Sequence, residues 1–179
     1  MPMGTHAFLA IDPGETTGVA ACYVNFTFGT KKEVLSNAKK KKSLEVKGNY
    51  LEQGRALGHL MDRFVYVANV ENLLSLENVH IVMEDFVLRR RTEGGATGNL
   101  TSCWVAAAAV MAYSLHPAQS PEEITALMIP PVEVVWQQPS EAKFVDNVKL
   151  KAYGLYEVGS EHKRDAWRHV ATRVDKLLP

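Results

Sequence analysis

The sequence carries no excess of either charge, since Lys plus Arg and Asp plus Glu each number 20 among its 179 residues. It also has little cysteine: Cys22 and Cys103 are the two thiols, and neither belongs to a Cys-x-x-Cys or Cys/His zinc pattern. The overall composition therefore gives no basic signal of a nucleic-acid partner. It also excludes a disulfide-rich framework and a zinc site of the Cys/His type.

Long hydrophobic runs are lacking too. The longest apolar stretch, residues 103–115, is short and rich in alanine, so it predicts a buried helix and no membrane association. The glycine-rich residues 89–98 lack the Gly-Lys-Ser/Thr ending of a phosphate-binding loop. No signal-peptide pattern, internal repeat or low-complexity linker is visible, so we expect a single domain over residues 1–179 in the cytoplasm, with reduced thiols.

Residues 8–20 predict a strand, a tight turn and a second strand. Pro13 presets its own φ angle, and Gly14 can take a positive φ, which suits the turn. The first strand ends on Asp12, whose carboxylate stands at the mouth of the hairpin. There it could contribute to a metal or phosphate site, or it could support the turn by accepting bonds from nearby amides.

The remaining chain predicts an α/β domain. Residues 32–37 suggest a weak third strand, with residues 38–43 as an exposed tip or sheet edge. Helices are predicted at 49–72, 100–115 and 161–178, buried strands at 79–86 and 132–136, and shorter helices after Ser120 and around Lys143. The outline is a mixed five-stranded sheet, an antiparallel meander followed by parallel strands, with helices on both faces.

Three acids stand out in this outline. Asp12 and Glu84 each end a buried strand, and Asp165 lies in the first turns of the last helix. Neighbouring strands bring their ends together, and acids so gathered can hold two Mg²⁺ ions about 4 Å apart. Each acid has an ordinary alternative: turn support, a surface position at a strand end, or a favourable place in the helix dipole. A shared site explains all three at once.

The order of the local motifs resembles the RuvC family of Holliday junction resolvases over most of the chain. The motifs are Ile11-Asp12-Pro13-Gly14 with Thr17-Gly18, Ile81-Val82-Met83-Glu84, Pro139-Ser140-Glu141-Ala142-Lys143, and His162-Lys163-Arg164-Asp165-Ala166. The resemblance implies an RNase H-like fold and Mg²⁺-dependent hydrolysis of four-way DNA junctions by a homodimer, with two metal ions in each active site. By position, Asp12, Glu84 and Asp165 would hold the metals and Lys143 would lie near the scissile phosphate.

His162 occupies a position where the family often has another Asp. On a helix, His162 and Asp165 share a polar stripe with Glu161 and His169, opposite Ala166. We therefore expect His162 and Asp165 to contact the metals, and Glu161 or His169 to contact these ligands without binding the metals themselves. An imidazole ligand would let Mn²⁺ replace Mg²⁺. The chain also departs from the family at residues 144–156, which replace a stretch rich in glycine and lysine.

The basic residues cluster even though the total charge is zero. Residues 31–47 contain seven lysines, among them Lys39, Lys40, Lys41 and Lys42, and Arg89, Arg90 and Arg91 form a second cluster. Both clusters are candidate contacts to the DNA backbone. For the lysine run, protection of a sheet edge against association is an equally good interpretation.

Other functions stay open from the sequence. A nuclease of this fold could act on RNA, flaps or replication forks, and a junction-binding protein could lack catalysis. ATP-binding proteins of the actin and heat-shock class also begin with an Asp-x-Gly turn, but they need a longer, two-lobed chain. If the protein is a dimer, helix 49–72 is the candidate interface, with Phe64 and Val65 or Tyr66 at its centre.

Overall fold

A central five-stranded sheet organises the molecule. The computed structural model describes residues 4–27, 29–72, 76–85, 100–114 and 132–178. The strand order is β3-β2-β1-β4-β5, with β1 (Thr5–Asp12) in the middle. β1 runs antiparallel to β2 (Thr17–Asn25) and parallel to β4 (Leu76–Glu84). β3 (Lys39–Val46) pairs antiparallel with β2, and β5 (Val132–Gln137) pairs parallel with β4. The predicted mixed α/β sheet is confirmed.

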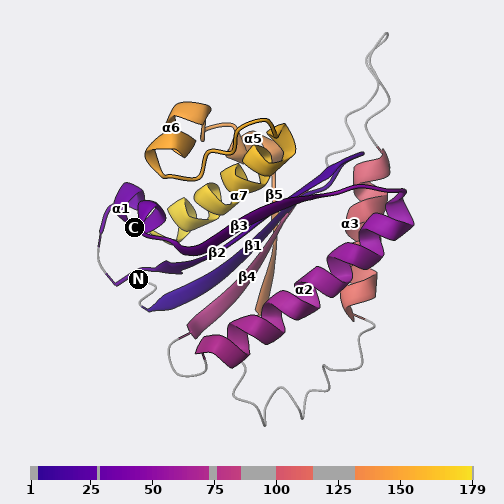
Figure 1. The fold of residues 1–179 in the computed structure, drawn as a ribbon, viewed down its shortest axis with the longest axis horizontal. Helices are drawn as coiled ribbons and strands as arrows, with labels where there is room; N and C mark the ends of the chain where they lie inside the picture. The colour runs from indigo at the N-terminus through magenta and orange to yellow at the C-terminus, as the bar shows by residue number, and fades with distance from the viewer. Residues whose placement is uncertain (1–3, 28, 73–75, 86–99, 115–131, 179) are drawn as a thin grey trace.

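Helices cover both faces of the sheet (Figure 1). α2 (Tyr50–Asn72) and α3 (Leu100–Ser114) pack together on one face. α7 (Glu161–Leu177) crosses the other face. The short helices α1 (Lys31–Ser36), α5 (Pro139–Ala142) and α6 (Asn147–Ala152) lie on the same side as α7. We call these the α2 face and the α7 face.

The alternation of side chains along the central strands determines on which face of the sheet the last side chain of each strand lies. Phe8 and Ala10 of β1 pack into the core of the α7 face, whereas Leu9 and Ile11 pack into the core of the α2 face. Successive side chains of a strand point to opposite faces, so the Asp12 side chain lies on the α7 face, like those of Phe8 and Ala10. The same alternation on β4, where Val82 belongs to the α7-face core, brings Glu84 to that face as well.

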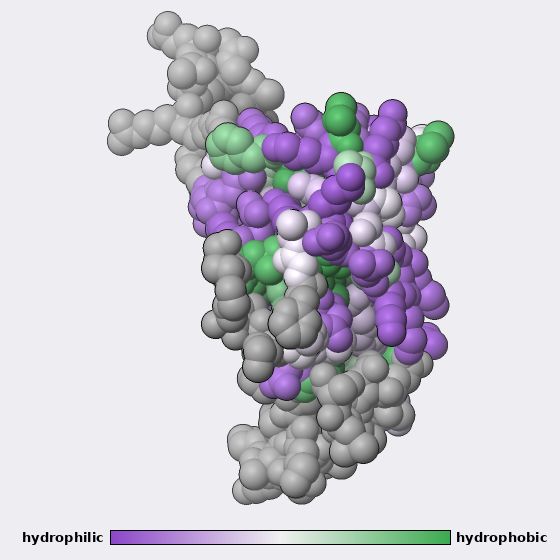
Figure 2. Space-filling model, turned by 90° about the vertical axis from the view of Figure 1, so that its left-hand side faces the viewer, coloured by the Kyte–Doolittle hydropathy of each residue, from purple (hydrophilic) through white to green (hydrophobic). Residues whose placement is uncertain are grey.

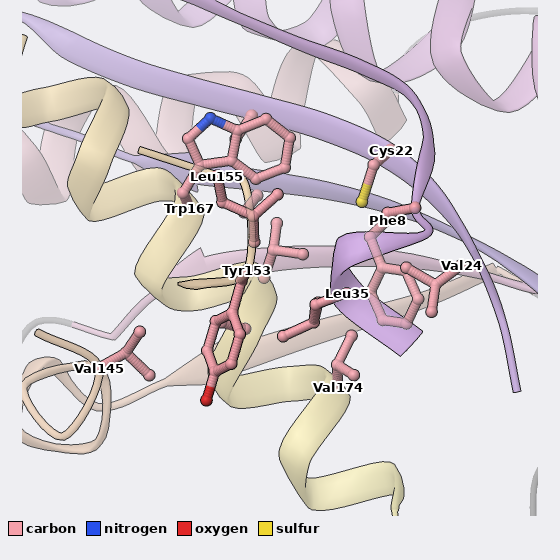
Figure 3. Packing of buried hydrophobic residues seen from close by; sticks show 14 of the residues in the cluster. Phe8, Cys22, Val24, Leu35, Val145, Tyr153, Leu155, Trp167 and Val174 are labelled. Carbon is pink, nitrogen blue, oxygen red and sulfur yellow. The ribbon is translucent and has the colours of Figure 1, made fainter. Parts of the chain in front are cut away.

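The α7-face core fixes the position of the helix that lies over these two acids. Trp167 of α7 is 1% exposed and packs in one cluster with Phe8 of the sheet and Leu35 of α1 (Figure 3). Val145, from the turn between α5 and α6, joins the same cluster. Burying side chains of this size supplies most of the free energy that holds a helix on a sheet. α7 and the α5–α6 turn are thus held by a shared apolar core.

Two local predictions are wrong. Residues 32–36 belong to helix α1 and Asn37 caps its end, whereas the third strand is Lys39–Val46. The reason is a capping box: the Glu33 carboxylate accepts from the Thr30 amide at 2.7 Å, while the Thr30 hydroxyl oxygen accepts from the Glu33 amide. Helix α6 also lies in a stretch expected to be loop, and Asp146 caps it by accepting from the Lys149 amide at 2.8 Å.

Some predictions fall outside the described residues. These are the second basic cluster, Arg89, Arg90 and Arg91, and the short helix expected after Ser120. Among the described helices, none combines the length and the hydrophobicity needed to cross a bilayer.

Candidate active site

Asp12 and Glu84 lie at neighbouring strand ends. In the parallel pair β1–β4, Ile11 stands opposite Met83, so the next residue on each strand is one of the two acids. Both residues follow a buried apolar run, and both are partly buried themselves. The carboxyl ends of parallel strands are where α/β proteins commonly bind ligands. The predicted convergence of these two acids is what the backbone register produces.

The turn after Asp12 is tied to helix α2. The Thr17 hydroxyl donates to the Gln53 side-chain oxygen at 2.5 Å, and the Gln53 amide nitrogen donates to the Glu15 carbonyl at 3.0 Å. Thr17 and Gln53 are both fully buried. These bonds hold the Pro13-Gly14 turn against α2 and so fix the end of β1.

His169 joins the two acids from α7. Its Nε2 lies 3.1 Å from Oε2 of Glu84, and its Nδ1 lies 2.9 Å from the side-chain oxygen of Gln137 at the end of β5. With Nδ1–H donating to the Gln137 oxygen, Nε2 presents its lone pair to the Glu84 carboxylate. Two acceptors that face each other at this distance require a proton or a cation between them.

These three side chains form a group that could hold a metal ion. One ligand atom each from Asp12, Glu84 and His169 lies within 4.8 Å of the others. Carboxylate oxygens suit Mg²⁺ and Mn²⁺, and an imidazole held by a hydrogen bond at its other nitrogen is a typical metal ligand. The donor set therefore fits a divalent cation.

The pKa values of the two carboxylates are shifted in opposite directions. Burial raises the pKa of Asp12 to about 9, helped by its hydrogen bond to Glu84 and by the negative charges of Glu84 and Asp165. Burial alone would also raise the pKa of Glu84, but hydrogen bonds from His169 and Asp12 and the charge of Lys143 hold it below its ordinary value. Without a cation, the pair keeps a proton on Asp12, as expected when two carboxylates share one buried site.

Asp165 lies beside this group and is paired with Arg168. Its Oδ1 accepts from Nη1 of Arg168, while Nε of Arg168 donates to the Val145 carbonyl at 3.0 Å. Nη2 of the same arginine donates to the Asn147 side-chain oxygen at 2.8 Å. The guanidinium therefore connects the α7 acid to the α5–α6 turn.

A cavity of about 580 Å³ opens over the strand ends and contains these groups. Lys143, at the end of α5, lines it together with the acids, Arg168 and His169. The cavity thus holds two cationic side chains beside a cluster of acids, an arrangement that could accept a phosphate next to the potential metal ligands.

The structure does not bring His162 to this group. Its main chain packs over Gly18 of β2, where an added Cβ would lie 2.0 Å from the His162 carbonyl oxygen. Its side chain acts electrostatically on Glu45 of β3. The imidazole at the carboxylates is that of His169, a position that sequence reasoning assigned only to a supporting role. His169 is one helical turn after Asp165, and that i,i+4 spacing was the available signal.

Sequence reasoning also missed Gln137 and Arg168. Gln137 is the residue opposite Glu84 in the β4–β5 pair, so its position follows from a register that the sequence alone does not fix. Arg168 follows Asp165 by three residues on α7, which is a common ion-pair spacing.

The lysine run lies on β3, the edge strand of the sheet, and is divided between its two faces. The Lys40 ammonium lies 5.4 Å from the centre of the Tyr23 ring, which belongs to the α2-face core. Lys41 donates to the Ser36 carbonyl at 3.0 Å, and its charge acts on Cys22 of the α7-face core. The run is therefore not one continuous patch beside the cavity.

Comparison with solved structures identifies similar folds. Thermus thermophilus RuvC in complex with a Holliday junction substrate matches 93% of this chain and 91% of its own, with a TM-score of 0.50 and 17% identity. The chain has the fold of RuvC. A second structure of T. thermophilus RuvC covers 93% of this chain and 92% of its own, at 18% identity and a TM-score of 0.45. The match to the yeast mitochondrial Holliday junction resolvase Ydc2 covers 97% of this chain and 80% of the Ydc2 chain, at 11% identity and a TM-score of 0.41.

Neither the protein-family models nor the curated protein sequences give a match to this chain. The resemblance to RuvC read from the sequence motifs is thus confirmed at the level of the fold, at low identity. The low identity is consistent with a divergent member of this fold.

Proposed function

We propose that this chain is a metal-dependent endonuclease that resolves Holliday junctions or other branched DNA. The observation that carries the proposal is the convergence of Asp12, Glu84 and His169 at the strand ends of a RuvC fold, with ligand atoms within 4.8 Å of one another. Mg²⁺ is the proposed cofactor, with two ions in each site and Mn²⁺ as a substitute. Four-way junctions are the proposed substrate, by analogy with the complex that T. thermophilus RuvC forms.

The proposed ligands are Asp12, Glu84 and His169, with Asp165 as the additional acid of the same cavity. A divalent metal bound there would supply a Lewis acid for the phosphoryl oxygens and would lower the pKa of a bound water. Binding requires Asp12 to lose the proton that its raised pKa retains, so the cation replaces that proton. The Gln137 oxygen holds His169 in the tautomer whose Nε2 is free for a metal.

The two cationic residues of the cavity have different proposed roles. Lys143 is exposed and free to move toward the scissile phosphate, so it can neutralise charge that develops on the phosphoryl oxygens. Arg168 is held by three partners and fixes the orientation of Asp165. The edge lysines and Arg89–Arg91 are proposed to add affinity for the DNA backbone without sequence preference.

Cleavage of a set of DNA substrates tests the proposal. Four-way, forked, flapped and linear DNA are incubated with the protein and Mg²⁺ or Mn²⁺. We expect Asp12→Asn and Glu84→Gln each to reduce cleavage of the preferred substrate by at least about a hundredfold, because each removes a metal ligand and its charge at nearly constant shape. Junction binding and the free energy of unfolding should change little.

Glu77→Gln is the matched control, because Glu77 is an exposed acid near the start of the same strand β4. It should cut like the wild-type protein. Cleavage by Asp12→Asn at the wild-type rate would reject the metal site. Junction binding without any cleavage by the wild-type protein would favour a binding protein that lacks catalysis.

A further inference from the structure

Hydrophobic side chains are unusually exposed in the segment that follows Lys143. Phe144 is 77% exposed, Val148 is 73% exposed and Val158 is 88% exposed, the three highest values among the large hydrophobic residues of the described chain. Figure 2 shows this face of the molecule as mainly hydrophilic, with isolated hydrophobic residues in its upper part, where α6 lies in Figure 1. Single exposed hydrophobic residues are common, but Phe144 directly follows Lys143, which lines the candidate active-site cavity.

The backbone holds Phe144 in this exposed position. The next residue, Val145, is buried in the α7-face core, and its amide donates to the Ala142 carbonyl at 3.0 Å. The Phe144 carbonyl accepts from the Lys149 ammonium at 2.6 Å. Val145 is buried in the core and Lys149 is bonded to the turn, so the backbone that carries the exposed Phe144 ring is held in place.

The same turn separates two cavities. The first is the candidate active site, lined by Lys143 and Val145. The second has a volume of about 290 Å³, and Val145 lines it as well, together with Phe144. Three lysines and two acids also line the second cavity: Lys31, Lys149, Lys176, Glu141 and Asp175.

The charges of the second cavity suit a phosphate. Lys31 lies 3.0 Å from Asp175, and Lys176 lies 2.7 Å from Glu141. Both acids are therefore neutralised by ion pairs, and Lys149 supplies the remaining positive charge next to Phe144. A ligand with one negative charge and one flat apolar surface would match the lysine and the ring together.

The two cavities are adjacent. Val145 lines both, and along α7 Asp165 and His169 line the first cavity while Thr172 lines the second. With a rise of about 1.5 Å per residue, Thr172 lies about 10 Å from Asp165 and about 5 Å from His169 along the helix axis. A strand whose phosphate enters the first cavity can therefore place a nearby nucleotide over the second.

We propose that Phe144 and the second cavity form a subsite for one unpaired nucleotide near the phosphate that is cut. The base stacks on the Phe144 ring, and its phosphate lies near Lys149. Every base has an apolar face, so this contact is tolerant of sequence. In a continuous duplex those faces are covered by neighbouring bases, and only a branch or a fork offers one. This inference rests on the proposed function and gives it a physical basis for selecting branched DNA.

The test uses binding, so that it does not depend on cleavage. In the Asp12→Asn background, junctions carry the fluorescent base 2-aminopurine at successive positions around the branch point. We expect the fluorescence to change on binding at one position, and Phe144→Ala to abolish that change. Phe144→Ala should weaken junction binding by about 5- to 150-fold, since a base–aromatic stack contributes about 1–3 kcal/mol. Binding to linear duplex should not change.

Three further variants test the result. Phe144→Trp should restore both the fluorescence change and the affinity, because it keeps an aromatic surface. Val158→Ala removes an equally exposed hydrophobic side chain that lines neither cavity, and it should bind like the parent. Lys149→Gln should lower the slope of log affinity against log salt by about one unit of charge.

Several outcomes would overturn the subsite. These are a Phe144→Ala variant that binds junctions like Val158→Ala, a variant that loses affinity for linear duplex equally, or a fluorescence change that survives the substitution. Failure of the proposed function looks different. In that case the wild-type protein cuts no branched DNA with either metal, although the fluorescence change on binding still depends on Phe144.

Discussion

Asp12 and Glu84 are chemically similar residues that the fold treats differently. Glu84 receives a partner from α7, whereas partial burial and the neighbouring acids Glu84 and Asp165 raise the pKa of Asp12 to about 9. In the proposed metal site, the proton on Asp12 takes the place of the positive charge that a cation would supply beside the ionised Glu84. Metal affinity should therefore increase with pH, because binding releases that proton.

The two histidines of α7 should differ in their effect on cleavage. His169→Ala should reduce metal-dependent cleavage by about a hundredfold or more, because it removes an imidazole that lies 3.1 Å from Glu84. His162→Ala should keep most of the activity, since His162 acts on Glu45 and not on the cavity. Single-turnover cleavage and the affinity for Mn²⁺, measured by calorimetry, check both variants.

The opposite result would support His162 as the metal ligand. If His162→Ala loses both Mn²⁺ affinity and cleavage while His169→Ala keeps them, the ligand expected from the family position is the correct one. A loss of activity in both variants with unchanged Mn²⁺ affinity would assign neither imidazole to the metal. The thermal stability of each variant separates these outcomes from misfolding.

A second buried histidine should make stability depend on pH. His80 of β4 is 1% exposed, its ring stacks on those of Phe8 and His6, and its Nδ1 lies 2.9 Å from Glu133. Burial, together with the charges of Arg173 and His6, lowers its pKa from 6.5 to about 4. The unfolded chain therefore binds a proton between these two pH values that the folded chain does not bind.

His80 should therefore contribute a fall in the free energy of unfolding of about 3 kcal/mol as the pH falls from about 6.5 to about 4, since one pKa unit corresponds to about 1.4 kcal/mol. The proton that Asp12 keeps in the folded chain contributes in the opposite sense over the same range, so the slope is measured by urea unfolding in the Asp12→Asn background. In that background His80→Phe should flatten the slope, whereas His59→Asn, a change at an exposed histidine of α2, should leave it unchanged. An equal slope in His80→Phe would contradict the assignment to His80.

At the scale of elements, sequence patterns predict local features such as helix caps, and they miss contacts that depend on the register between strands. The capping residues Asn49 and Glu52 indicate the start of α2, and both form the expected bonds. The Thr30–Glu33 box is an equally local signal, and it favours helix α1 over the strand expected at residues 32–37. The pairing of Glu84 with Gln137 and the approach of His169 depend on contacts between distant segments, so the sequence alone could not supply them.

Close packing at Gly18 controls the position of α7. An added Cβ there would lie 2.0 Å from the His162 carbonyl oxygen, which is main chain and cannot rotate away. Gly18→Ala should therefore shift α7 and lower the free energy of unfolding by about 1–3 kcal/mol. It should also reduce cleavage at saturating DNA and metal, because α7 carries Asp165 and His169.

Gly58→Ala is the matched comparison on the opposite face. Its Cβ would lie 2.5 Å from that of Ala112, between α2 and α3. We expect a similar loss of stability with little loss of cleavage, since neither helix supplies a residue to the cavity. Chemical unfolding and saturated cleavage rates measure the two effects separately. Equal losses of cleavage in both variants would mean that general destabilisation, and not the position of α7, limits the activity.

At the scale of the whole molecule, the absence of net charge is compatible with a DNA-binding face because the charges are arranged locally. The candidate cavity combines its acids with Lys143 and Arg168, and the second cavity gathers three lysines. The opposite face presents α2 and α3, with the exposed aromatic residues Tyr50, Tyr66 and Trp104. The proposed catalytic end of the molecule and the proposed surface for self-association are thus formed by different elements.

A four-way junction has two-fold symmetry, and two symmetric cuts need two active sites, so we predict a homodimer. Of the α2 residues expected at its interface, Val65 is buried in the core, Phe64 packs partly against that core, and Tyr66 is 67% exposed. Tyr66→Glu should therefore give a folded monomer, whereas Val65→Glu should unfold the chain, because it buries a charge. Sedimentation at micromolar concentration, with circular dichroism for folding, checks both. A wild-type protein that sediments only as a monomer without DNA would instead indicate an enzyme that cuts one strand at a time.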